Sequence, residues 1–162
     1  MILSESESRR IIERALSFSS ADEIRVNLSG GRSGNTRFAL NSITTSGDED
    51  TLSVRVLAYF GKQHATARGT EFTDDALQRI VQTAEEAARF APEDPEYVPE
   101  LQPQTYLPIN PYFSSTAAAT PQLRAKGVQS SIEPSINKDL LSAGFFSNRH
   151  GFSAVGNNHK LF

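Results

Sequence analysis

The stretch from Leu52 to Phe60 most constrains the fold, because its apolar and polar side chains alternate with a period of two. Leu52, Val54, Val56, Ala58 and Phe60 fall on one side, and Ser53, Arg55, Leu57 and Tyr59 fall on the other. This period is typical of a strand with one buried face. It predicts that Val54 and Val56 face the helices of the domain and that Arg55 faces outward.

Three further strands are predicted around this one. Residues 24–28 alternate in the same way, and the glycine-rich stretch 30–35 that follows is read as a hairpin turn. Residues 37–43 form the next apolar run, and the polar residues 46–50 are read as an acidic turn. Gly61 and Lys62 predict a tight turn into a strand over 63–69. The four strands are expected to form an antiparallel meander after one helix.

Two helices have clear start signals. Ser4 followed by Glu7 has the pattern of a capping box and predicts a helix that ends near Ser19. Thr73 precedes a helical apolar pattern over 74–91, which Pro92 ends. The predicted fold class is α+β, with a mostly antiparallel sheet covered on one face by these two helices.

The rest of the chain begins with a proline-rich stretch. Seven of the eight prolines fall between Pro92 and Pro121, which predicts an extended connector, and its aromatic residues predict that it packs against some other surface. A second α/β segment then begins, with a helix from Thr120–Pro121 to about Glu133 and strands over 140–147 and 152–155. The predicted organisation is therefore an N-terminal α+β domain at 1–91, a connector at 92–121 and the start of a second segment at 122–162.

Composition excludes several classes of function. The chain has no Cys, so disulfides and thiolate metal sites are excluded. The net charge is -3, and residues 71–100 carry nine acidic and two basic side chains, so no basic stripe is available for nucleic acid. The first ten residues lack the apolar core of a signal peptide, and no stretch is apolar enough to span a membrane. We expect a cytoplasmic protein that binds neither nucleic acid nor membrane.

No catalytic residue and no metal ligand are predicted. The three histidines, His64, His150 and His159, have no ligand spacing, with His64 in a strand pattern and the other two in or beside turns. The acidic run 48–50 lacks the spacing of a calcium loop and is read as a solvated turn. The glycines at 30–34 match no phosphate-binding motif, and no serine lies in a nucleophile elbow.

The order of several short motifs resembles a known family. R-F-A-L-N-S-I (37–43) is followed by the acidic run, S-V-R-V (53–56), G-K-Q (61–63) and a Thr-capped helix that ends in A-P-E-D-P-E-Y (91–97). This order resembles the N-terminal region of the TldD/PmbA family, the modulator of DNA gyrase proteins, which are regarded as zinc peptidases. The resemblance covers about residues 5–100. At 157–160 the family's N-S-x-G turn is replaced by Asn-Asn-His-Lys.

The resemblance implies that the chain is the N-terminal, non-catalytic portion of a zinc metallopeptidase subunit, a hydrolase that acts in peptide proteolysis or maturation. The family's H-E-x-x-x-H helix would lie beyond Phe162, so this region is expected to hold no zinc and to be inactive alone. Its expected partners are the missing C-terminal region, a homologous subunit in a dimer, and a peptide substrate.

Two alternatives remain open. The chain could be an assembly module of a metal-free PmbA-like partner subunit, or a protein-binding domain that modulates DNA gyrase. Whether it is of the TldD or the PmbA type is left open. Arg37, Asn41 and Arg55 lie in the part that most resembles the family, and they are either polar positions on the wet face of a sheet or interface residues.

Overall fold

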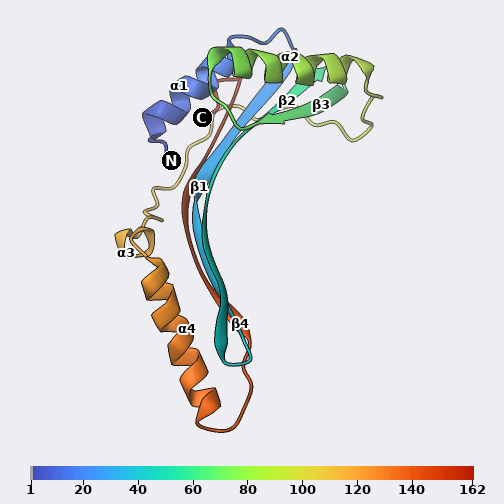
Figure 1. The fold of residues 1–162 in the computed structure, drawn as a ribbon. Coiled ribbons are helices and arrows are strands. Elements are labelled where there is room, and N and C mark those ends of the chain that lie inside the picture. The colour runs from blue at the N-terminus through green and yellow to red at the C-terminus, as the bar shows by residue number, and fades with distance from the viewer. Residues whose placement is uncertain (1) are drawn as a thin grey trace. The chain divides into compact units, whose positions relative to one another are not determined.

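The computed structural model describes residues 2–162 and contains one four-stranded sheet with helices (Figure 1). The strand order is β3-β2-β1-β4. The elements are α1 (Glu5–Leu16), β1 (Glu23–Ala39), β2 (Ser42–Phe60), β3 (Gln63–Gly69), α2 (Asp74–Phe90), α3 (Ser114–Ala117), α4 (Pro121–Ile136) and β4 (Gly144–Asn157). The predicted α+β class is confirmed.

Helix α1 begins with the predicted capping box. The Ser4 hydroxyl accepts a hydrogen bond from the Glu7 amide at 3.3 Å, and the Ser4 amide donates to the Glu7 carboxylate at 2.8 Å. Two backbone donors that have no partner inside the helix are thereby satisfied. The helix buries Ile12 and Ala15, and it ends at Leu16, three residues before the predicted end.

Helix α2 also agrees with its sequence pattern. The Thr73 side chain accepts from the Ala76 amide, and Asp74 and Asp75 lie in the first turn, where the helix dipole favours negative charge. The buried face includes Leu77, Val81 and Ala84. The helix is one residue shorter than predicted.

The β2–β3 hairpin has the predicted turn. Gly61 takes a positive φ of 56°, so Phe60 pairs with Gln63 across a two-residue turn. In this register Val54 lies opposite Gly69, and Val56 lies opposite Ala67. Both valines are 0% exposed, and the prediction that they face the core is confirmed.

One apolar cluster joins this part of the sheet to α1 and α2. Its buried members are Ile12, Ala15, Ile24, Val26, Leu28, Val54, Val56, Ala58, Ala67, Leu77, Val81 and Ala84. Full burial of one Val, Leu or Ile side chain stabilises a fold by about 1.5–3 kcal/mol. The cluster therefore holds the two helices on one face of the sheet, as predicted.

The predicted turn at residues 30–35 is wrong, because β1 runs through it. Gly31 and Gly34 are glycines because other atoms pack where a side chain would lie, and not because φ is positive. A Cβ at Gly31 would lie 2.5 Å from the His150 carbonyl oxygen, and one at Gly34 would lie 1.9 Å from Arg124 Nη1. Only glycine permits such approaches.

The hairpin between β1 and β2 turns at Leu40 and Asn41, where φ is 50° and 58°. Two successive residues with positive φ are typical of a type I′ turn, whose twist matches that of the strands. The predicted turn at 46–50 is also wrong, since these residues lie within β2. The meander therefore has three strands, and β4 later joins the sheet beside β1.

The C-terminal part combines confirmed and corrected predictions. Helix α4 starts at the predicted Thr120 cap and Pro121, and it continues to Ile136, three residues beyond the predicted end. The predicted strand 152–155 is confirmed, and the predicted strand 140–147 is confirmed from Gly144 onward. The predicted turn at 148–151 is wrong, because β4 is continuous and contains His150. His159 lies in a turn and His64 in β3, as predicted.

The chain forms two compact units that interleave along the sequence. Unit 1 comprises residues 1–30, 52–108 and 152–162, and unit 2 comprises residues 31–51 and 109–151. The boundaries predicted at 91 and 121 stay a prediction, because compactness alone does not show which segments fold independently. Among residues 2–162, no helix is long and apolar enough to cross a membrane.

Candidate assembly surface

Unit 2 has almost no hydrophobic core of its own. Within residues 31–51 and 109–151, the buried hydrophobic side chains are Val128 and Ile132, both on α4. The members of the main apolar cluster all belong to unit 1. Because apolar burial is the dominant favourable term in folding, unit 2 needs other contacts to fix its structure.

A buried arginine supplies part of these contacts. Arg124 on α4 is 0% exposed, and its guanidinium donates to Asp48 at 2.8 Å and to Asn148 at 2.9 Å. Its Nε donates to the Thr36 hydroxyl at 3.4 Å. Thr36, Asp48 and Asn148 belong to β1, β2 and β4, so one side chain joins α4 to three strands. We call these four residues the Arg124 hub.

The Arg124 hub explains two features of unit 2 that the sequence did not predict. Asp48 is exposed, as predicted, but it lies in β2 and not in a turn, and its carboxylate pairs with a fully buried guanidinium. Gly34 leaves the space that the guanidinium occupies. A buried charge is tolerated only when it is paired and hydrogen-bonded. The buried position of Arg124 therefore requires the hydrogen-bonding partners of the Arg124 hub and the space left by Gly34.

A set of hydrogen bonds at the tip of the β1–β2 hairpin connects two segments of unit 2. The Asn41 side chain donates to the Leu140 carbonyl at 2.8 Å and accepts from the Ser142 amide at 2.8 Å and hydroxyl at 2.7 Å. The segment between α4 and β4 is thereby held on the hairpin. The side chain of Asn41, a predicted interface residue, makes these bonds within the chain.

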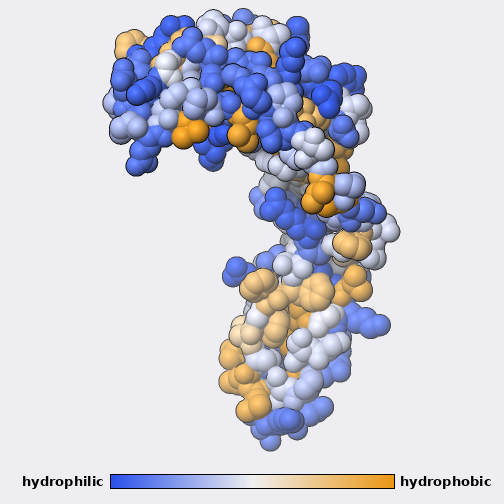
Figure 2. Space-filling model, turned by 180° about the vertical axis from the view of Figure 1, so that it is seen from behind, coloured by the Kyte–Doolittle hydropathy of each residue, from blue (hydrophilic) through white to orange (hydrophobic). Residues whose placement is uncertain are grey.

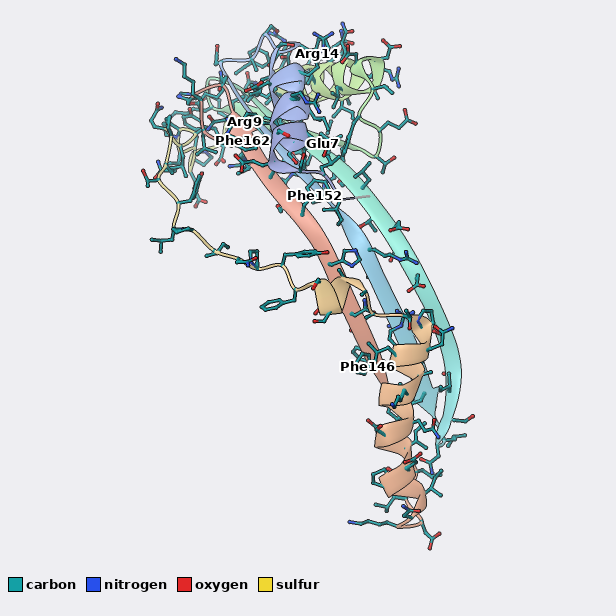
Figure 3. All side chains as sticks on the ribbon, turned by 90° about the vertical axis from the view of Figure 1, so that its left-hand side faces the viewer. Glu7, Arg9, Arg14, Phe146, Phe152 and Phe162 are labelled. Atoms are coloured by element: carbon teal, nitrogen blue, oxygen red, sulfur yellow. The ribbon has the colours of Figure 1, made fainter. Side chains whose placement is uncertain are left out.

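Large apolar side chains cover much of the surface of unit 2. Figure 2 shows orange side chains gathered over the part of the molecule that carries α4. Exposed members are Leu40, Ile43, Ile109, Tyr112, Phe113, Leu123, Ile136, Leu140, Leu141, Phe145 and Phe146. We call this set the unit 2 apolar surface. Phe146, labelled in Figure 3, lies against Gly127 of α4. Phe145 is 67% exposed.

The other two predicted interface residues lie on exposed parts of the sheet. Arg37 on β1 and Arg55 on β2 are both exposed, as expected for polar outward positions. Arg55 pairs with Arg68 in the register and donates to the Thr66 hydroxyl at 3.5 Å. Arg37 belongs to unit 2 and Arg55 to unit 1. An interface role for the three residues stays a prediction.

The beginning of the connector is fixed to unit 1 by a buried carboxylate. Glu23 accepts from the Tyr97 hydroxyl at 2.7 Å and from the Glu100 amide at 3.3 Å, and it lies 3.1 Å from His159 Nε2. The hydrogen bond to Glu23 raises the pKa of Tyr97 to about 12, with burial adding to the effect. The Glu100 carboxylate in turn pairs with Arg25 at 3.0 Å.

The same contacts cover part of the second sheet face. Tyr59 lies edge-on to Tyr97, with ring centroids 5.7 Å apart, and burial together with the Glu100 charge raises the Tyr59 pKa. Leu57 and Tyr59 are buried, although the period-two pattern predicted that they face outward. The prediction that the aromatic residues of the connector pack against another surface holds for Tyr97, which contacts Tyr59 and Glu23, whereas Tyr106, Tyr112 and Phe113 are exposed.

The described residues do not fit a zinc ion, which the family resemblance assigns to another part of the assembly. Within residues 2–162, no group of three or more His, Cys, Asp or Glu side chains is arranged to hold a metal ion. The nitrogens of His159 are instead engaged by Glu23 and Gln102. No step of zinc chemistry is therefore assigned to this chain.

Sequence reasoning missed the residues that organise this surface. Arg124 occupies an apolar position in a weak helical pattern, and its partner Asp48 lies 76 positions away. Phe145 and Phe146 lie within the predicted strand 140–147, where one of two neighbouring side chains is expected to be buried. No signal in the neighbouring residues shows whether a strand packs on a hydrophobic core or stays exposed to solvent.

Comparison with known proteins finds similarity in structure only. No protein-family model matches the sequence, and no curated protein matches it. TldE from Thermococcus kodakarensis is similar in structure, with a TM-score of 0.82 and 16% identity, over 94% of this chain and 35% of that chain. A proposed modulator of DNA gyrase from Bacteroides thetaiotaomicron also has a TM-score of 0.82, with 10% identity, over 96% of this chain and 37% of that chain.

A third similar structure is a proposed modulator of DNA gyrase from Thermotoga maritima. Its TM-score is 0.78 at 11% identity, and the match covers 95% of this chain and 36% of that chain. The chain thus spans about a third of the length of these solved structures. At these identities the similarity shows the fold alone. Over nearly its whole length the chain adopts a fold found in TldE and in modulators of DNA gyrase, so its resemblance to the TldD/PmbA family is confirmed at the level of the fold.

Proposed function

We propose that this chain is a non-catalytic assembly portion of a TldD/PmbA-type zinc metallopeptidase subunit. The observation that carries the proposal is unit 2, which buries two hydrophobic side chains and exposes the unit 2 apolar surface. Large exposed apolar patches mark protein interaction sites. We propose that a homologous subunit covers this surface in a cytoplasmic dimer.

We propose that the catalytic part of the function lies outside this chain. The described residues offer no metal cluster, and the chain spans about a third of the length of similar structures. The zinc ion and the base that activates water would come from the part of a subunit that this chain does not span. The role of this chain in peptide hydrolysis or maturation is then to hold subunits together.

An association experiment tests this proposal. The purified chain is mixed with TldE from Thermococcus kodakarensis, and its mass is measured by light scattering, alone and in the mixture. We expect self-association or a mixed complex. Phe145→Ser should weaken it about tenfold, because aromatic residues dominate interface energies. Phe90→Ser is the matched control, since Phe90 lies in unit 1 and is 91% exposed.

Two results would overturn the proposal. One is a wild-type chain that stays monomeric in both samples, and the other is equal weakening by the two substitutions. A peptide-hydrolysis assay with added zinc tests the catalytic assignment separately. Hydrolysis by the purified chain that a chelator abolishes would contradict a non-catalytic role.

A further inference from the structure

A cavity of about 250 Å³ lies within unit 2, where β1, β2 and β4 meet the segment that joins α3 to α4. In Figure 1, α3 leads into the N-terminal end of α4. A cavity needs roughly 10–15 Å³ to hold one water molecule, so this one has room for a ligand of several non-hydrogen atoms. Its lining consists of Arg32, Gly34, Asp48, Asn148, His150 and residues 117–121. We propose that this cavity binds a small oxyanion, a carboxylate or a phosphate group.

Arg32 on β1 provides hydrogen-bond donors to the cavity. A guanidinium has five N–H groups in a planar fork. The charged neighbour of Arg32 is Asp48, and the Arg32 Nη2 lies 3.5 Å from its carboxylate. That distance is too long for a charge-assisted hydrogen bond, which spans about 2.7–2.9 Å. The N–H groups of Arg32 can therefore be directed in pairs at two oxygens of a ligand, the geometry that carboxylates and phosphates accept.

His150 provides a donor from β4. This residue lines the cavity, and its Nδ1 is buried without a hydrogen-bond partner among residues 2–162. A ligand can therefore reach the ring only at Nε2. A neutral imidazole carries one N–H group, and in the Nε2–H tautomer that group donates to an oxygen of the ligand.

The N-cap residue of α4 provides a third donor. The Thr120 hydroxyl oxygen accepts from the Leu123 amide at 3.2 Å, and its own O–H group remains able to donate. Pro121 occupies the first helical position, and Thr120 and Pro121 both line the cavity. The positive end of the helix dipole is thus at the cavity, where it favours an anion. Donors from β1, β4 and the start of α4 surround the same space.

The side-chain charges also favour an anion. Arg124 Nη1 lies beside Gly34, and the Arg124 guanidinium pairs with the Asp48 carboxylate at 2.8 Å. Arg32 adds a second guanidinium to the one that already neutralises Asp48. The cavity therefore has a net positive charge, which attracts an oxyanion and repels a cation.

The Arg124 hub holds part of the lining in place. The Arg124 guanidinium donates to both Asp48 and Asn148, and these two side chains line the cavity. Walls that are ordered before binding reduce the entropy that a ligand must offset. This inference uses unit 2 alone and does not rest on the proposed function.

Titrations of the isotope-labelled 162-residue chain test the proposal. The two probes are N-acetylglycine, which ends in a carboxylate as a peptide does, and inorganic phosphate, each at constant ionic strength maintained with chloride. We expect saturable shifts of the amide signals of Arg32, Thr120 and His150, together with a higher midpoint of thermal unfolding. Tighter binding of N-acetylglycine would identify a peptide carboxylate as the ligand, and tighter binding of phosphate would identify a phosphate group.

A first pair of variants tests the guanidinium. Arg32→Gln should weaken binding of the better probe about tenfold or more, because it removes the charge-assisted hydrogen bonds. Arg37→Gln is the matched control. Both arginines are exposed on β1, but Arg37 does not line the cavity, so its loss should leave the affinity unchanged.

A second pair separates binding from folding. Thr120→Asp keeps a good N-cap for α4, because Asp caps helices at least as well as Thr. The new carboxylate lies at the cavity and repels an anion, so binding should weaken about tenfold or more while the fold is retained. Thr73→Asp makes the same change at the cap of α2 in unit 1, and it should leave the affinity unchanged.

Three results would overturn the proposal. The first is the lack of saturable shifts at Arg32, Thr120 and His150 with both probes. The second is the appearance of the same shifts with chloride alone at the same ionic strength. The third is equal weakening by the two members of each pair. If a variant does not fold, the titrations of the wild-type chain with the two probes and with chloride decide.

Discussion

The guanidinium of Arg124 donates to the carboxylate of Asp48 at 2.8 Å, and the Arg124 side chain is 0% exposed. This ion pair crosses from α4 to β2 within unit 2. A buried pair of this kind adds little net stability compared with apolar residues, but loss of one partner is costly because it leaves an unpaired buried charge.

Asp48→Ala should therefore destabilise the chain by about 1–3 kcal/mol, since the buried Arg124 would keep only its neutral partners Asn148 and Thr36, while the Asp48 side chain itself is 27% exposed. Arg32→Ala is the control, because Arg32 lies 3.5 Å from the same carboxylate and is 54% exposed. Its loss should cost less than about 1 kcal/mol. Denaturant midpoints measure both changes in stability. Similar losses of stability for the two variants would contradict the stabilising role of the Arg124–Asp48 pair.

Gly34→Ala should destabilise unit 2 because the new methyl group would overlap Arg124 Nη1 and displace the guanidinium. Gly47→Ala provides the matched control, since a Cβ at Gly47 meets nothing within 4 Å. We expect Gly47→Ala to be neutral or slightly stabilising. Amide exchange in α4 is the measurement, with faster exchange expected for Gly34→Ala alone.

The contribution of Glu85 to stability should depend on pH. Burial opposes ionisation of this carboxylate, but hydrogen bonds from Ser19, Ser20 and Ala21 outweigh burial and lower its pKa below the ordinary value of 4.5. Because the pKa is lower in the folded chain, the stabilisation is complete above about pH 4.5 and is lost as the pH falls through the folded-state pKa.

The free energy of unfolding should thus be larger for the wild type than for Glu85→Gln at about pH 7. This difference should shrink as the pH falls to about 3, through the range in which carboxylates titrate. Glu86→Gln, at the exposed neighbouring position of α2, should show a small difference at both pH values. Equal pH dependence of the two variants would show that the contacts of Glu85 do not lower its pKa.

Val54→Asp should cost several kcal/mol, because it places an unpaired carboxylate among buried side chains of the apolar cluster; the order of magnitude is about 4 kcal/mol. Arg55→Ala should cost less than about 1 kcal/mol, because Arg55 is exposed. Urea denaturation of both variants is the measurement. A one-residue error in the strand register would make Arg55 the costly position.

The chain should hold no stoichiometric zinc after mild dialysis, because the described residues 2–162 include no cluster of three or more metal-binding side chains. Elemental analysis gives the zinc content per chain. A tightly held equivalent of zinc that survives His159→Ala and His150→Ala would point to ligands that neither the sequence nor the structure suggests.

The sequence by itself determined the elements whose signals are local. The Ser4–Glu7 box, the Thr73 and Thr120 caps, the strand that ends at Phe60 and the turn at Gly61 are each confirmed. Each signal depends on residues within a few positions of one another, so it is present in the sequence whatever the rest of the chain does.

The tertiary structure alone decided where the long strands turn and which surface stays open. Gly31 and Gly34 resemble turn residues, but they lie in a strand because His150 and Arg124 approach them closely. Asp48 resembles a solvated turn residue, but it pairs with a side chain 76 positions away. Such contacts arise only when distant segments meet. The sequence therefore predicted the fold class and the unit 1 core, whereas the Arg124 hub and the unit 2 apolar surface required the structure.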